Sequence, residues 1–273
     1  MKNLKEQLWT VHKFGGSSLA SHEKIFNMAN IVKGIHSDRS AVVVSAMGGM
    51  TDRFIELTKL SANKDSQVKT KLKSIQDDFS KTCESLLSAD AAQSMFEIFE
   101  QDTKELESIL DGIAVIKECS PKTEALVSGT GEIWTAQIVN AVMKELGLNS
   151  QWIDARKVLR VNEDQGQNLV QYPESQEQLL KQFDELDHPA IIVITGFIAS
   201  NENGVMTTLG RNGSDFSASI FGHLLDAERI NIWTDVDGVL SANPHQVPEA
   251  EVIPVLSYEE ATEMAYFGAN VLH

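Results

Sequence analysis

The sequence is poor in cysteine: Cys83 and Cys119 are its two cysteines among 273 residues. Two cysteines cannot build a disulfide framework, and neither stands in a Cys/His cluster with the spacing of a zinc site. Residues 1–7 also lack the apolar core of a secretory signal. We therefore expect a cytoplasmic protein.

Basic residues and long apolar runs are scarce too. The chain has 23 Lys and Arg against 39 Asp and Glu, a formal net charge of −16, which argues against nucleic acid or an anionic membrane as partner. Its longest apolar run, residues 190–194 extended through 197–199, falls far short of the roughly 20 residues of a membrane helix. An acidic protein that binds an anionic ligand must do so locally, so isolated cations beside glycines become informative.

Short β-rich runs alternate with helical stretches, a pattern typical of an α/β protein with a largely parallel sheet. The unbroken apolar runs at 41–44 and 190–194 are typical of strands covered on both faces. Between about 65 and 117, apolar residues recur every three or four positions and predict a helical hairpin packed on the α/β body. The expected strands are residues 9–14, 41–45, 123–128, 150–154, 190–195, 205–208 and 230–234. The expected helices are residues 21–36, 51–61, 131–146, 175–187, 214–225 and 257–267.

The first expected strand ends in a loop with the composition of a phosphate site, KFGGSS. Gly15 and Gly16 let backbone N–H groups approach an anion closely, and the helix after the loop adds its positive end. Lys13 stands before these glycines and can reach the same anion, whereas the lysine of a P-loop follows its glycines. Ser17 adds a hydroxyl group. For this loop alone, an ordinary strand-to-helix turn with a surface lysine is the alternative.

A second glycine-rich stretch surrounds Arg211 and also precedes an expected helix. The forked guanidinium group of Arg211 suits a carboxylate, because it can bind both oxygens. Gly213 and Ser214 open the helix, and helix capping is the structural alternative for Ser214 and Asp215. Asp215 would not bind an anion, but it could orient Lys13.

Polar groups follow three further expected strands. Thr234, Asp235 and Asp237 come after a strand that we expect to be buried, where they either hold a nucleotide or form a simple β-turn. Glu132 follows another strand and either pairs with a substrate ammonium group or complements a helix dipole. Ser45 ends a third strand. Five such loops at one edge of a sheet suit phosphoryl transfer, whose transition state needs cations and N–H donors more than covalent chemistry.

These motifs, in this order, resemble those of the aspartate kinases, members of the amino acid kinase family. The resemblance runs from Lys13 to His273, and its ends are most similar to bifunctional aspartokinase–homoserine dehydrogenases of the methionine-linked type. It implies the amino acid kinase fold, an α/β three-layer αβα sandwich with a mainly parallel central sheet. It implies a single kinase domain with an aspartate-binding lobe over about residues 1–200 and a nucleotide-binding lobe over about 201–273. Regulatory and dehydrogenase regions would follow residue 273.

The resemblance implies that ATP phosphorylates the side-chain carboxylate of L-aspartate to give 4-phospho-L-aspartate, the first step of lysine, threonine and methionine biosynthesis. Lys13 would stabilise the transferring phosphoryl group, and Asp215 would orient Lys13. The residues implied on the phosphate and nucleotide side are Gly15, Gly16, Ser17, Gly213, Ser214, Thr234, Asp235 and Asp237. Those implied for aspartate are Ser45, Glu132, Phe197 and Arg211. Mg²⁺ would arrive with ATP, since the sequence has no dedicated metal cage, and similar enzymes are homodimers or higher homo-oligomers.

Three positions on the implied nucleotide side depart from the family pattern. Leu240 replaces a tyrosine, while His245 and Asn270 replace an arginine and a lysine. A rival hypothesis therefore keeps the fold for aspartate binding or oligomerisation, with weak or lost phosphoryl transfer. A nucleotide-dependent dehydrogenase is disfavoured because the first loop lacks Gly-x-Gly-x-x-Gly. A sibling kinase for glutamate or a nucleoside monophosphate is disfavoured by the specific sequence of that loop.

Overall fold

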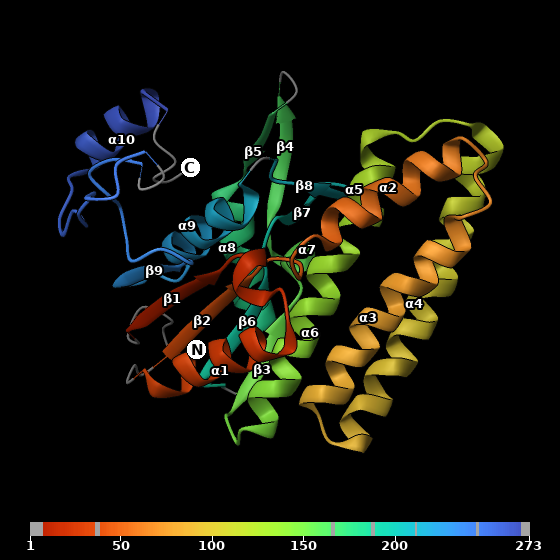
Figure 1. Ribbon diagram of the computed structural model, residues 1–273, viewed down its shortest axis with the longest axis horizontal. Coiled ribbons are helices and arrows are strands. Elements are labelled where there is room, and N and C mark those ends of the chain that lie inside the picture. The colour runs from red at the N-terminus through yellow and green to blue at the C-terminus, as the bar shows by residue number, and fades with distance from the viewer. Residues whose placement is uncertain are drawn as a thin grey trace.

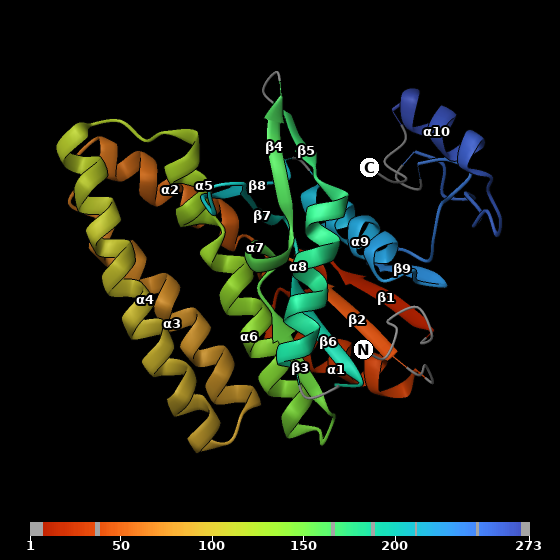
Figure 2. The same cartoon turned by 180° about the vertical axis from the view of Figure 1, so that it is seen from behind.

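A parallel sheet forms the centre of the computed structural model, which describes residues 8–35, 39–164, 167–186, 189–210, 212–243 and 246–268. Its strands run in the order β3 (Ser150–Ile153), β6 (Ile191–Thr195), β2 (Arg39–Val44), β1 (Trp9–Phe14) and β9 (Arg229–Trp233). One face is covered by α1 (His22–Gly34) and α6 (Thr130–Glu145), the other by α8 (Tyr172–Glu185) and α9 (Gly213–Leu224) (Figures 1 and 2). The predicted three-layer α/β architecture is confirmed.

The middle of this sheet holds the core. Residues 41–44 of β2 and 192–194 of β6 have no exposed surface. Strands buried on both faces need apolar side chains at every position, which explains why their sequences do not alternate. Each β–α connection returns to the same end of the sheet, so the loops after β1 and β2 lie beside each other.

The predicted helical hairpin is the pair α3 and α4, which packs beside α2 (Figure 1). Their bounds are Val68–Leu86, Ala89–Ile116 and Met50–Ala62. A cluster of fully buried rings joins the hairpin to the body: Phe54, Phe79 and Phe99 surround Trp134, with ring centroids 5.9, 5.1 and 4.6 Å from that indole. The Trp134 Nε1–H group donates to Asp102 at 2.6 Å, so the buried indole keeps a polar partner.

The prediction of a strand at 123–128 is wrong, because these residues belong to α5 (Pro121–Ser128). Alternating Thr, Ala and Val suggested a strand, but stronger signals stand just before them. Ser120 caps the helix by accepting a hydrogen bond from the Thr123 backbone N–H, and Pro121 occupies its first turn. Capping and tertiary packing outweigh β propensity here.

A second sheet, mostly antiparallel, stands next to the first, and the sequence predicted little of it. Its order is β5 (Gln167–Val170), β4 (Arg160–Asp164), β7 (Ile198–Asn201) and β8 (Met206–Thr208). Only β8 was expected. The other strands are short and rich in Asn, Gln, Glu and Ser, so their polar composition hid them. The short helices η2 (Gly16–Leu19) and α7 (Ala155–Val158) complete this part of the chain.

The chain after β9 differs from the rest. Residues 234–243 and 246–268 contain α10 (Tyr258–Tyr266), which stands away from the sheet in both views (Figures 1 and 2). None of these residues is buried. Across the part of the chain that the structure describes, no helix is both long enough and apolar enough to cross a membrane.

Candidate active site

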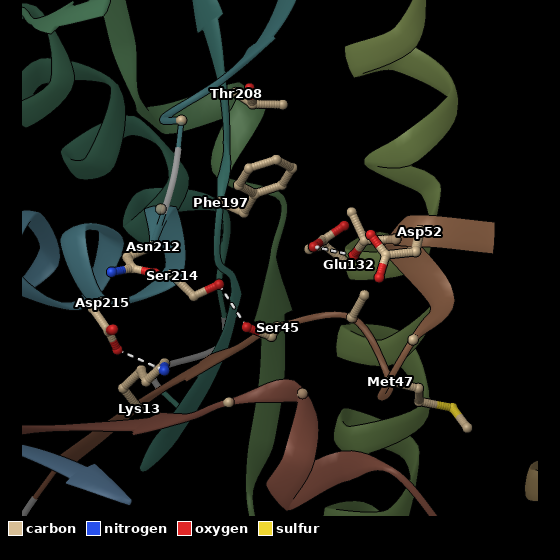
Figure 3. A pocket seen from close by; sticks show the side chains of 17 residues that line it. Lys13, Ser45, Met47, Asp52, Glu132, Phe197, Thr208, Asn212, Ser214 and Asp215 are labelled. Carbon is tan, nitrogen blue, oxygen red and sulfur yellow. Dashed lines mark hydrogen bonds and ion pairs between the residues drawn. The ribbon is translucent and has the colours of Figure 1, made fainter. Parts of the chain in front are cut away.

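An open cavity of about 510 Å³ lies at the carboxyl ends of β1 and β2, where α2, α6 and α9 begin (Figure 3). It brings together predicted site residues from five separate segments: Lys13, Gly15, Gly16, Ser45, Glu132, Phe197, Gly213, Ser214 and Asp215. The loop before Glu132 follows helix α5 rather than a strand, which corrects the expected strand-to-helix junction. It nevertheless reaches the same cavity, because α6 packs against the sheet beside β2.

Lys13 and Asp215 form an ion pair at one wall of the cavity. The Lys13 Nζ atom lies 2.6 Å from Asp215 Oδ1, which joins the end of β1 to the first turn of α9 (Figure 3). The lysine side chain is 12% exposed. A Cβ atom added at Gly15 would lie 3.2 Å from that Nζ, so the glycine leaves the ammonium group open to the cavity. The pair therefore holds one cation in a fixed place.

The helices α2, α6 and α9 all begin at this cavity, and their positive ends favour an anion there. Ser45 Oγ donates to Ser214 Oγ at 2.6 Å and ties the end of β2 to the start of α9. A Cβ at Gly196 would lie 2.9 Å from the Val44 carbonyl oxygen and 3.0 Å from Ser214 Oγ. The glycine thus permits this close approach of strand and helix.

Glu132 lies on the side of the cavity opposite Lys13 (Figure 3). Glu132 is 3% exposed, and its Oε2 atom has no hydrogen-bond partner among the described residues. Thr51 donates to Oε1 over a long 3.4 Å. Burial raises the pKa of this carboxyl from 4.5 to about 7, against the smaller opposing effect of hydrogen bonds from backbone groups and Thr51. A buried carboxyl short of partners is suited to receive a cation from a ligand.

Phe197 places its ring in the cavity from a strained backbone. Its φ is +66°, a region that non-glycine residues rarely occupy. The Phe197 N–H donates to Ser217 Oγ at 2.9 Å, and its carbonyl accepts from the Leu209 N–H at 2.7 Å. A Cβ at Gly213 would come within 2.8 Å of the ring. These contacts therefore keep Phe197 in its strained backbone conformation, as is common at ligand-binding positions.

Several residues that line the cavity are not among the predicted site residues. Met47, Thr51 and Asn212 stand in stretches that the sequence singled out, whereas Asp52 and Thr208 were missed. Asp52 matters most, because its carboxylate lies near Glu132 and gives that side of the cavity a second acidic group (Figure 3). The glycine pair at 48–49 before α2 was the available signal. It marks a strand-to-helix junction like the one after β1.

Other predicted site residues lie elsewhere. Ser17 is exposed on η2, and its carbonyl accepts from Lys24 Nζ at 2.7 Å. The three predicted nucleotide-side residues after β9 are exposed and do not line the cavity: Thr234, Asp235 and Asp237. They follow directly after Trp233, which pairs with Phe14 at the end of β1. Arg211, His245 and Asn270 lie outside the described residues. Leu240 forms an isolated bridge with Val252.

Gly48 gives a test of how tightly the cavity loops pack. A Cβ there would lie 2.8 Å from Ala20 Cβ and 3.1 Å from the Gly16 carbonyl oxygen. We expect Gly48→Ala to lower the free energy of unfolding by about 1–3 kcal/mol, measured by urea denaturation. The matched control is Gly112→Ala in α4, where nothing lies within 4 Å and a gain of up to about 1 kcal/mol is expected. Equal changes in both variants would contradict the packing argument.

Residues 9–273 match the sequence pattern of the amino acid kinase family. The chain belongs to this family. It is 40% identical over 270 residues to bifunctional aspartokinase/homoserine dehydrogenase 2, chloroplastic, of Arabidopsis thaliana. It is 38% identical over 271 residues to bifunctional aspartokinase/homoserine dehydrogenase 2 of Escherichia coli K12. These alignments cover 98% and 96% of this chain but 29% and 32% of the relatives, so the chain spans about a third of their length.

Solved structures give the same result. E. coli aspartokinase III in complex with aspartate and ADP matches with a TM-score of 0.85 at 31% identity, over 97% of this chain and 57% of that one. Clostridium acetobutylicum aspartate kinase matches with a TM-score of 0.75 at 25% identity, over 97% of this chain and 55% of that one. The resemblance to aspartate kinases inferred from the motifs is confirmed.

Proposed function

We propose that this member of the amino acid kinase family transfers the γ-phosphoryl group of ATP to the side-chain carboxylate of L-aspartate. The observation that carries the proposal is the arrangement of Lys13 and Glu132 across one cavity (Figure 3). One wall offers a fixed cation and the N-terminus of α9 to phosphate oxygens. The other offers a buried carboxyl oxygen, which has no partner among the described residues, to an ammonium group. An amino acid placed between them would direct its own carboxylate toward the phosphate.

In the proposed reaction, an oxygen of the aspartate side chain attacks the γ-phosphorus as its bond to the bridging oxygen breaks, and ADP leaves. The Lys13 ammonium group would neutralise charge on the transferring phosphoryl oxygens, with N–H groups of the loop at Gly15 and Gly16 as further donors. Asp215 would keep the ammonium group aimed at them. We propose Arg211 for the α-carboxylate, on the strength of the motif.

On the substrate side, we propose that the strained Phe197 and Ser45 shape the aspartate pocket. We propose that Thr234, Asp235 and Asp237 form part of the nucleotide side, since they follow the strand next to β1. No cluster of three or more acidic, His or Cys side chains suited to a metal occurs among the described residues. Magnesium would therefore enter with ATP, held mainly by phosphates and water. The cytoplasmic location, the two lobes and a homo-oligomeric state stay predictions.

The proposal is tested by trapping the product. Incubation with Mg-ATP, aspartate and hydroxylamine should yield aspartyl hydroxamate, while glutamate in place of aspartate should yield far less. Equal rates with the two amino acids would point to a sibling kinase. Product no more abundant than with Lys13→Ala would leave the fold as a binding module.

A further inference from the structure

His12 is a buried ionisable residue that the proposed reaction does not use. It precedes Lys13 on β1 and has no exposed surface. Its Nδ1 atom lies 3.3 Å from Trp233 Nε1 and 3.3 Å from Asn231 Nδ2, both on β9. An indole N–H can only donate, so Nδ1 must accept and the ring hydrogen must sit on Nε2. Desolvation lowers the pKa of His12 to about 4, which agrees with a neutral ring.

A histidine at this position lowers the stability of the fold. Its Nε2 atom is buried and has no hydrogen-bond partner among the described residues. A buried N–H without a partner destabilises a fold, whereas a phenylalanine of similar shape would fill the space without that penalty. Trp233 and Asn231 are each partly exposed, so water can accept their hydrogen bonds if the Nδ1 atom of His12 is removed. Stability alone therefore gives no reason for a histidine here.

The strand that His12 contacts packs against α9, where Ile230 lies close to Gly222, but its last residue, Trp233, has few other restraints. β9 is an edge strand, and each of its residues is at least partly exposed, so the expectation of a buried strand before Thr234 is wrong. No residue described in the chain after it is buried. Apart from the backbone pairing with β1, Trp233 is held by stacking on Phe14, with ring centroids 5.7 Å apart and planes 3° from parallel. Stacking permits a ring to slide, whereas the bond to Nδ1 fixes its direction.

Trp233 is the last residue of β9, and Thr234 follows it directly. We propose that His12 is a positioning residue that orients Trp233 and thereby sets the nucleotide-side turn at 234–237 against the phosphate loop after Lys13. The inference rests on the proposed function, since it assigns this turn to the nucleotide. On this proposal, β1 carries both Lys13, the cation that faces the phosphate, and His12, which aligns the neighbouring turn at 234–237.

The test uses variants that separate the acceptor from the bulk of the ring. His12→Phe and Trp233→Phe each remove the hydrogen bond but keep an aromatic ring, and His12→Asn restores an acceptor oxygen near the place of Nδ1. His22→Phe, at an exposed histidine, is the matched control. Binding of Mg-ADP is measured by calorimetry, the aspartate KM by hydroxamate formation, and exchange of the backbone amides in 229–243 by mass spectrometry.

We expect His12→Phe and Trp233→Phe each to weaken Mg-ADP binding about fivefold, with an aspartate KM within about twofold of the parent. The melting temperature of His12→Phe should be no lower than that of the parent, because the unpartnered Nε2–H group is removed. The double variant should be no weaker than either single one, because one interaction is lost in all three. His12→Asn should bind as the parent does. Faster amide exchange in 229–243 should accompany each loss of affinity.

Unchanged Mg-ADP affinity in folded His12→Phe would overturn the proposal, as would equal losses for nucleotide and aspartate. If His12→Phe does not fold, Trp233→Phe decides by the same criteria. If the parent protein binds no Mg-ADP, the proposed function has failed, and amide exchange decides separately whether His12 fixes β9. Unchanged exchange in both phenylalanine variants would then overturn the inference.

Discussion

Replacing Lys13 with methionine is expected to lower kcat for aspartyl phosphate formation by about a thousandfold or more. The reason is geometric as well as electrostatic. The ammonium group is held 2.6 Å from Asp215 and aimed at a cavity ringed by helix N-termini. Methionine keeps the length of the chain but removes the charge, so phosphoryl oxygens lose the one fixed cation that the described part of the cavity wall supplies. The rate would be measured with saturating Mg-ATP and aspartate.

Two further variants give this prediction its controls. Lys104→Met removes an exposed lysine of α4 whose partner is Glu100, and it should leave kcat unchanged. Asp215→Asn should lower kcat by a smaller factor than Lys13→Met, since the cation stays but loses its orienting anion. A Lys13→Met enzyme with more than about a tenth of the parental rate would assign the phosphoryl contact to another group.

The folded arrangement was predictable where one signal dominated. Residues 41–44 and 190–194 are apolar without interruption and rich in Val and Ile, which is typical of strands covered on both faces. Prediction failed where local and tertiary signals competed. Residues 123–128 look like a strand until Pro121 and the capping Ser120 are weighed. β7 was missed because its apolar part, Ile198 and Ala199, is only two residues long before Ser200 and Asn201.

The site shows the same division between local signal and tertiary contact. Lys13 and Asp215 could be paired from the sequence because each stands at the junction of an element and a glycine-rich loop. The positive φ of Phe197 could not be foreseen, because it depends on bonds to Ser217 and Leu209 from other segments. Asp52 was missed for a similar reason. Its place near Glu132 comes from the packing of α2 beside α6, which no local motif records.

The pH dependence of aspartate binding should follow Glu132. Burial raises the pKa of its carboxyl to about 7, so below that pH the empty site holds a proton that a ligand ammonium group must displace. The aspartate KM should therefore rise as pH falls below about 7, approaching tenfold per pH unit, and level off above it. Glu132→Gln should raise the aspartate KM about a hundredfold at pH 8 and abolish this slope, with the ATP KM little changed. A slope that survives in Glu132→Gln would assign the titration to another group.

Burial of the Glu132 carboxyl should also lower the free energy of unfolding of the ligand-free protein. Its folded pKa lies above its ordinary value of 4.5, so the folded state holds the proton more tightly than the unfolded state does. Stability is therefore lost as pH rises from about 4.5 to 7, and the full cost, on the order of 3 kcal/mol, applies at pH 8. Glu132→Gln should recover much of it in urea denaturation without ligand, whereas Glu97→Gln, at an exposed position of α4, should change nothing. A Glu132→Gln protein less stable than the parent at pH 8 would mean that the carboxylate already has a cation as partner in the empty site. The expected result, weaker binding together with higher stability, would identify Glu132 as a group whose burial serves the ligand and not the fold.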